Sequence, residues 1–168
     1  MSNIDFEGGI GMLGNQVEVF GGVKNKAVFH FHQGGRRVMS VEAPQFVMSV
    51  DELLVSNHVA LRLYLLDTVT GVTMDSLYHN NLSFRYDNKT RKMMAFRSEK
   101  DYDGPFHDYY HGLDIFVEAL YWSIDGNHVD FRRMEGVNPT SEGHVVSPNY
   151  LRFEDFKKLQ GLDGTHPM

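Results

Sequence analysis

Two pairs of histidines are spaced so that the members of each pair can act together. His30 and His32 lie two residues apart in a run that alternates apolar and polar residues, so both imidazoles point to one side of a β-strand. His107 and His111 lie four residues apart and would share one face of a helical turn. Imidazole is a common ligand of zinc and other divalent transition metals. The four residues therefore form a candidate metal site; the alternative is that each pair lies on a solvated face and the protein has no cofactor.

An aromatic stretch bounded by glycine and proline surrounds the second histidine pair. It contains four aromatic residues, Tyr102, Phe106, Tyr109 and Tyr110. Aromatic side chains with polar tips offer a large contact area at a low entropic cost. The stretch is therefore a candidate binding surface, with a buried loop cap as the alternative.

Motifs of the common catalytic mechanisms are missing from the sequence. It has no cysteine, no phosphate-binding glycine loop, no dinucleotide fingerprint and no Gly-x-Ser-x-Gly motif. A triad assembled from distant residues stays open, and the catalytic residues of such an enzyme are unknown. The sequence thus favours a non-catalytic protein over an enzyme.

Charge and hydropathy limit the kinds of partner. Sixteen basic residues against 22 acidic ones give an acidic chain of net charge −6, which disfavours binding to nucleic acid. The sequence shows no signal-peptide pattern and no apolar run long enough to cross a membrane. The absence of cysteine fits a reducing compartment, so we expect a cytoplasmic protein.

Three reversals of direction give the strongest structural signal. Gly34-Gly35, Asn88-Lys89 and Asp125-Gly126 each separate two runs of alternating apolar and polar residues. Such dipeptides favour the tight turns of β-hairpins. For the third hairpin, a turn at Gly126-Asn127 is equally compatible with the alternation.

Each turn predicts a register for its hairpin. The first pairs Phe31 with Val38 and His30 with Met39. The second pairs Tyr86 with Arg91 and Phe84 with Met93. The third places five apolar residues on one face: Leu120, Trp122, Ile124, Val129 and Phe131.

Further elements are expected between and beyond the hairpins. Alternation predicts a strand over 59–66 and shorter strands at 17–20, 45–48, 72–78 and 144–147. Ser49 and Glu52 form a capping box that predicts a helical turn at 53–55, with a bulged strand as the alternative. One helical turn is expected at 105–111 and a longer helix at 153–160.

These elements predict a mainly β protein, an antiparallel sandwich or flattened barrel of about eight to ten strands with a short C-terminal helix. An α+β fold is the alternative. Residues 1–168 suit a single domain, in which residues 1–16 form a flexible N-terminal arm or a strand supplied to a partner.

The leading functional hypothesis is a non-catalytic protein that binds a protein partner, such as an accessory, inhibitor or immunity-type protein or a structural subunit. A homo-oligomer is compatible with this hypothesis, because exposed edges of β domains often pair. The first alternative is a small metal-dependent enzyme or metal-binding β-barrel that uses the histidine pairs. The second is a barrel that encloses a small ligand.

Overall fold

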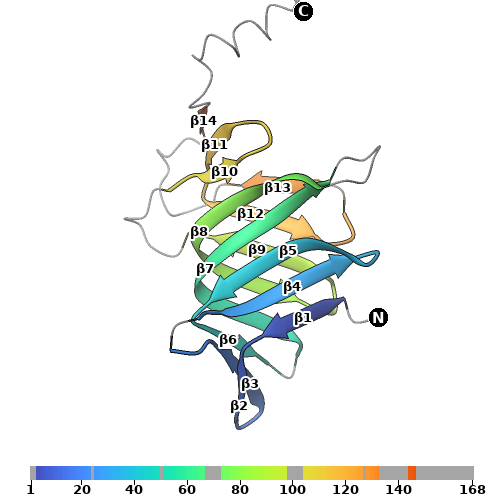
Figure 1. Cartoon of the computed structure of the whole chain (residues 1–168), viewed down its shortest axis with the longest axis vertical. Coiled ribbons are helices and arrows are strands. Elements are labelled where there is room, and N and C mark those ends of the chain that lie inside the picture. The colour runs from blue at the N-terminus through green and yellow to red at the C-terminus, as the bar shows by residue number, and fades with distance from the viewer. Residues whose placement is uncertain are drawn as a thin grey trace, which may run out of the picture.

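The structure is a computed structural model that describes residues 3–23, 25–49, 51–66, 73–97, 104–126, 128–132 and 144–146. These residues form strands and turns, and the strands pair in antiparallel fashion throughout (Figure 1). The predicted mainly β, antiparallel fold is therefore confirmed. No helix that could span a membrane occurs in the described ranges. The C-terminal helix predicted at 153–160 lies outside them.

Within the described ranges, fourteen strands form one continuous open sheet. Their bounds are β1 (Ile4–Glu7), β2 (Gly9–Leu13), β3 (Gln16–Phe20), β4 (Ala27–Gln33), β5 (Arg36–Ala43), β6 (Gln45–Met48), β7 (Leu53–Leu66), β8 (Thr73–Asp87), β9 (Lys92–Phe96), β10 (Phe106–Asp108), β11 (Leu113–Phe116), β12 (Ala119–Ser123), β13 (Val129–Arg132) and β14 (His144–Val146). The strand number exceeds the expected eight to ten, because short strands form at both ends of the described chain.

Two long strands, β7 and β8, belong to both layers of the folded sheet (Figure 1). The front layer has the order β1-β4-β5-β7-β8-β10-β11-β14, and the back layer has the order β2-β3-β6-β7-β8-β9-β12-β13. The start of β7 pairs with β6 in the back layer, whereas residues 60–63 pair with β5 in the front layer. The sheet therefore folds over on itself where β7 and β8 bend.

The bend coincides with bulges in both strands. Asn57 and His58 of β7 lie opposite the single residue Ser83, and Asn80 and Asn81 of β8 lie opposite Ala60. His58 has a positive φ of 56°, which an L-residue adopts only at a local cost. Bulges sharpen the local twist of a strand pair, so they let one strand pair turn from one layer into the other.

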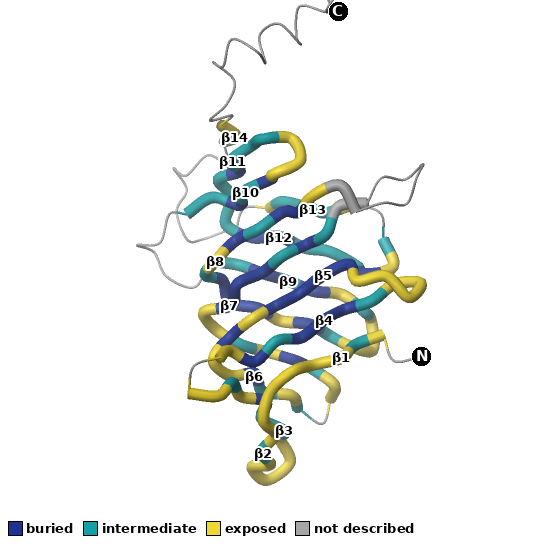
Figure 2. The backbone as a smooth tube through the Cα atoms, viewed as in Figure 1, coloured by how far each residue is buried: buried dark blue, intermediate teal, exposed yellow. Residues whose placement is uncertain are grey.

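Aromatic contacts join the inner faces of the two layers. The ring of Phe31 on β4 lies 4.8 Å from that of Tyr86 on the back half of β8, in an edge-on arrangement. Phe29 lies 4.8 Å from Phe46 on β6. Figure 2 shows that the buried residues lie along the centres of both layers, while the β2–β3 hairpin at the lower end is largely exposed.

The first hairpin forms at the predicted turn but with a different register. Gly34 and Gly35 both have positive φ, as a tight hairpin turn requires. From Phe31 toward the start of β4, however, the register shifts by one residue: Phe31 lies opposite Met39 and His30 opposite Ser40. The predicted pairs, Phe31 with Val38 and His30 with Met39, are therefore wrong. A bulge at Val38 causes the shift, and it allows both Val38 and Met39 to be buried.

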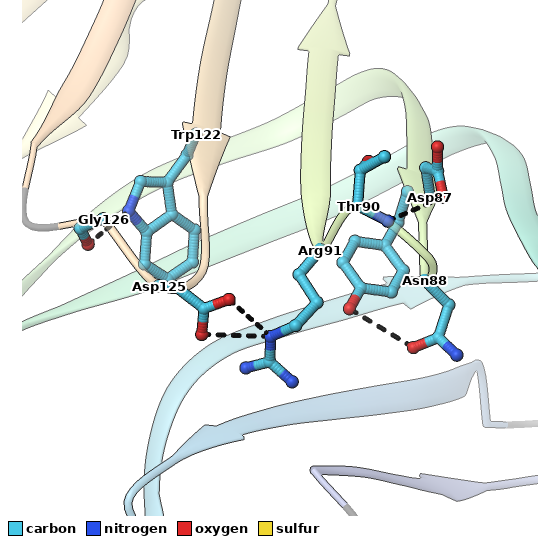
Figure 3. Close-up of polar contacts among 8 residues, drawn as sticks. Asp87, Asn88, Thr90, Arg91, Trp122, Asp125 and Gly126 are labelled. Carbon is cyan, nitrogen blue, oxygen red and sulfur yellow. Dashed lines mark hydrogen bonds and ion pairs between the residues drawn. The ribbon is translucent and has the colours of Figure 1, made fainter.

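The second hairpin has a wider turn than predicted. Tyr86 pairs with Met93 and Phe84 with Ala95, so the predicted partners are wrong by two residues. The carboxylate of Asp87 accepts a hydrogen bond from the backbone N–H of Thr90 at 3.1 Å (Figure 3). It accepts a second from the backbone N–H of Lys89 at 2.9 Å. These bonds, that from Thr90 above all, lower the pKa of Asp87 and stabilise the four-residue turn. Because the shift is even, the predicted apolar face is retained.

The third hairpin has the register that a turn at Asp125-Gly126 predicts. Trp122 lies opposite Val129, and Leu120 lies opposite Phe131. The predicted strand over 59–66 is confirmed as part of β7, and the short strands predicted at 17–20 and 45–48 are confirmed within β3 and β6. Those predicted at 72–78 and 144–147 are confirmed over residues 73–78 of β8 and 144–146 of β14, and residues 72 and 147 lie outside the described residues.

The two short helical turns predicted in the described ranges are wrong. The backbone N–H of Glu52 bonds to the carbonyl of Ser49 in a tight turn, and β7 begins directly afterwards, as the bulged-strand alternative predicted. Residues 106–108 form β10, because their backbone pairs with β8 on one side and β11 on the other. Residues 4–13 of the segment expected as an arm form β1 and β2, which pair with β4 and β3.

His79 is a buried histidine held in one neutral form. Its Nε2–H donates to the carbonyl of Gly104 at 3.0 Å, and its Nδ1 accepts from the backbone N–H of Asn81 at 3.1 Å. Burial lowers the pKa of His79 from 6.5 to about 4. The folded state therefore excludes a proton that the unfolded state binds.

We expect this exclusion to make stability depend on pH. The folded-state pKa of His79 lies below the unfolded value, so the free energy of unfolding falls as the pH drops from 6.5 to 4 and is insensitive to this group above 6.5. The loss amounts to up to about 3 kcal/mol. Urea unfolding at a series of pH values would measure it, and His79→Gln should flatten the profile in this window. An equally steep profile in the variant would contradict the assignment.

Candidate functional site

An apolar groove opens where the edges of the two layers meet near the N-terminus. Its volume is about 320 Å³. Ile4 and Phe6 of β1 line one side, and Ile10 of β2 with Val17 and Val19 of β3 line the other. Phe29, Met48, Leu54 and Tyr86 complete the lining. The groove is thus an opening into the space between the inner faces of the layers.

Alternation along β1 and β2 produces this arrangement. Ile4 and Phe6 point inward while Asp5 and Glu7 point to the outer face, as period-two geometry requires. Gly8 carries the chain directly from the front layer to the back layer with a φ of 154°. A Cβ atom at this position would lie 2.8 Å from the carbonyl oxygen of Phe20. Glycine therefore allows β1 and β2 to lie close together on opposite sides of the groove.

Polar residues close one end of the groove. The side-chain amide of Asn88 donates to the Glu52 carboxylate at 2.7 Å, and the Tyr86 hydroxyl donates to Asn88 at 3.5 Å. Burial raises the pKa of the Tyr86 phenol. The neighbouring turns are tied together by an ion pair between Arg91 and Asp125 at 2.9 Å (Figure 3). This end of the groove is therefore built from cross-linked turns.

The groove continues into an exposed apolar surface. We call it the N-terminal apolar surface and define it by four side chains on the groove side of their strands: Phe6, Ile10, Met12 and Met48. Met12 is 80% exposed near the tip of the β2–β3 hairpin, where it lies opposite the groove residue Val17. Isolated apolar residues on a surface are ordinary, whereas a contiguous patch marks a binding site.

Two edge strands border this surface. Within the described ranges, β1 pairs with β4 alone and β2 pairs with β3 alone. An edge strand presents backbone N–H and C=O groups that can accept a further strand. The site therefore combines an apolar groove with two strands that lie at edges of the described sheet.

The first histidine pair faces one side of β4, as predicted, and both rings meet carboxylates of β1. His32 Nδ1 lies 2.9 Å from Asp5, and His30 Nε2 lies 3.6 Å from Glu7. His30 Nδ1 also contacts Ser40 Oγ at 2.9 Å. These contacts fasten β1 to β4 along the outer face.

The second pair lies elsewhere in the front layer. His107 on β10 is 2.7 Å from Asp114, and His111 in the following turn is 2.6 Å from Asp108. Strands β5, β7 and β8 separate β4 from β10, which amounts to about 19 Å at the usual strand spacing. The structure thus does not bring the two pairs together, and the described residues contain no cluster of three or more potential metal ligands.

The predicted aromatic surface is divided by the fold. Phe106 is fully buried, with its ring 4.7 Å from that of His79 and 5.7 Å from that of Phe131. Tyr109 and Tyr110 are exposed in the turn between β10 and β11, and Tyr102 lies outside the described residues. Phe106 thus belongs to the buried cap that was the alternative interpretation.

The sequence does not predict the groove, because residues 1–16 are expected to form a flexible arm or a strand supplied to a partner. The signal was nevertheless present: Ile4 and Phe6 alternate with Asp5 and Glu7, which is the pattern of a strand with one apolar face. What the sequence could not show is that the apolar faces of β1 and β2 oppose each other.

The chain matches no protein-family model, and no curated protein matches it in sequence.

The separation of the histidine pairs gives a prediction about metal binding. We expect any zinc held by His30 and His32 to be unaffected by His107→Ala, because three strands lie between β4 and β10. Calorimetric titration of each single-alanine variant with zinc would measure this independence. A single bound zinc that is lost in both His32→Ala and His107→Ala would contradict it.

Proposed function

We propose that this is a non-catalytic binding protein that holds an extended apolar segment of a protein partner in the groove between β1 and β2. The observation that carries the proposal is the N-terminal apolar surface, which leads directly into that groove. Exposure of such a surface costs free energy in water, and a partner that covers it recovers that free energy.

The edge strands favour an extended segment over a helix. A segment that pairs with β1 or β2 would satisfy backbone groups on one side, and its alternate side chains would enter the groove. A volume of about 320 Å³ is small for a helix but is sufficient for two or three apolar side chains.

Charge indicates which residues should alternate with the apolar ones. Asp5 and Glu7 lie on β1 and Glu52 lies at the end of the groove, while the whole chain has a net charge of −6. Basic residues in the partner segment would complement these carboxylates. We therefore propose a segment that alternates apolar and basic residues, met in the cytoplasm, with a second copy of this chain as the other kind of protein partner.

The experiment is an anisotropy titration with a labelled seven-residue peptide that alternates valine and lysine. We expect saturable binding, and we expect Met48→Asn to weaken it about tenfold, because a polar group would then face the apolar segment. Val55→Asn is the matched control: both side chains are 38% exposed, but Val55 pairs with Val47 and so faces away from the groove. Its effect should stay within about twofold.

Four results would reject the proposal, and the first three concern the peptides. These are no saturable binding to the wild-type chain, equal losses in the two variants, or equal affinity for a peptide that carries glutamate in place of lysine. A fourth is tight binding of dodecanoate without binding of either peptide, which would assign the groove to a small apolar ligand instead.

A further inference from the structure

A second hollow lies on the outer face of the front layer, on the side of β4 opposite the groove. It has a volume of about 380 Å³. Six larger side chains surround it: His30, Arg37, Glu42, Arg62, Tyr64 and Tyr78. Ser40 and Ala60 form its floor. We call this feature the polar hollow.

Strand register explains why the hollow exists. His30, Ser40, Arg62 and Tyr78 occupy one cross-strand row on β4, β5, β7 and β8, so their side chains point to the same side. Ala60 lies opposite Glu42 in the next row of that face. Two small residues on neighbouring strands are thus flanked by long ones, which leaves space above the backbone.

Hydrogen bonds hold the walls in place. Ser40 Oγ lies 2.9 Å from His30 Nδ1 and 3.2 Å from the Tyr64 hydroxyl. Arg62 donates from Nη1 to Ser76 Oγ at 2.8 Å, and its guanidinium carbon lies 4.9 Å from the Tyr78 ring centroid. The Arg62 guanidinium is therefore oriented before any ligand arrives, which lowers the entropic cost of binding.

The hollow is rich in hydrogen-bond donors. Arg62 uses one guanidinium N–H group on Ser76, and Arg37 forms no hydrogen bond or ion pair with any residue that the structure describes. Guanidinium groups match the geometry of carboxylate and phosphate oxygens and bind them in pairs of hydrogen bonds. The Ser40 and Tyr64 hydroxyl groups add at most one further donor between the two arginines, because the two hydrogen bonds among His30, Ser40 and Tyr64 use at least one hydroxyl proton.

A catalytic role fits the distances less well. Glu7, His30 and Ser40 follow one another in the order of an acid, a base and a nucleophile. The 3.6 Å between Glu7 and His30 Nε2 is longer than a hydrogen bond, however, and Ser40 Oγ is also in contact with Tyr64. The row therefore serves better as a rigid wall than as a nucleophilic centre.

We infer that the polar hollow binds the oxyanion group, a carboxylate or a phosphate, of a small ligand between Arg37 and Arg62. Glu42 accepts a hydroxyl or amino group from the other end of the same ligand. The site is independent of the groove, because it lies on the opposite face of the front layer and shares no lining residue with it.

The test is an NMR titration of the ¹⁵N-labelled full chain with inorganic phosphate and, separately, with acetate. We expect saturable shifts at the amides of Ser40, Ala60 and Arg62 with at least one of the two anions, and the tighter one identifies the ligand class. Arg62→Gln should weaken that binding about tenfold. Ala60→Leu should abolish it by filling the hollow, and it removes no donor.

Arg85→Gln is the control, because Arg85 is exposed on β8 in the back layer and its loss changes the net charge equally. Amide dispersion in each spectrum verifies that the variants fold, and the two substitutions in the hollow test the site independently. The inference is overturned if neither anion gives saturable shifts at the hollow. It is also overturned if Ala60→Leu binds as well as wild type, or if Arg85→Gln weakens binding as much as Arg62→Gln does.

Discussion

Phe31 can pack against Tyr86 only because β7 and β8 each pass from one layer into the other. The two aromatic residues lie on β4 and on the back half of β8, which meet face to face once the sheet is folded. The bulges at Asn57–His58 and Asn80–Asn81 make that fold possible at a local cost in backbone conformation. The buried aromatic contacts between the layers offset this cost.

Both candidate sites follow from this bend. Folding one open sheet over on itself leaves its edges side by side, and the inner faces are accessible where the edge strands are short. The apolar groove lies at such an edge, between β1 and the β2–β3 hairpin. The polar hollow instead lies on the outer face, where a row of polar side chains crosses four strands of the front layer. One sheet thus presents an apolar site and a polar site on opposite faces.

The fold class and the faces of the hairpins could be predicted from the sequence, because side-chain parity depends on the number of residues alone. The predicted apolar face is retained even where the predicted turn is wrong. The β8–β9 loop is two residues longer than expected, yet Phe84 and Tyr86 are buried. The bulge at Val38 could not be foreseen, because Val38 and Met39 are both apolar and either suits the core. The change in alternation at Asn57 and His58 was a visible signal of the bend. Its direction, and with it the proximity of β1 to β2, depends on contacts between residues far apart in the chain.

The wall formed by β1 has a consequence for the dynamics of the groove. This wall is a four-residue edge strand, attached to β4 by its backbone and by the acid–histidine contacts at Asp5 and Glu7. Local opening of such a strand exposes little buried area and costs far less than global unfolding. The aperture can therefore widen while the aromatic centre of the molecule stays intact. By linkage, an occupant that pairs with β1 would also protect its amides from hydrogen exchange.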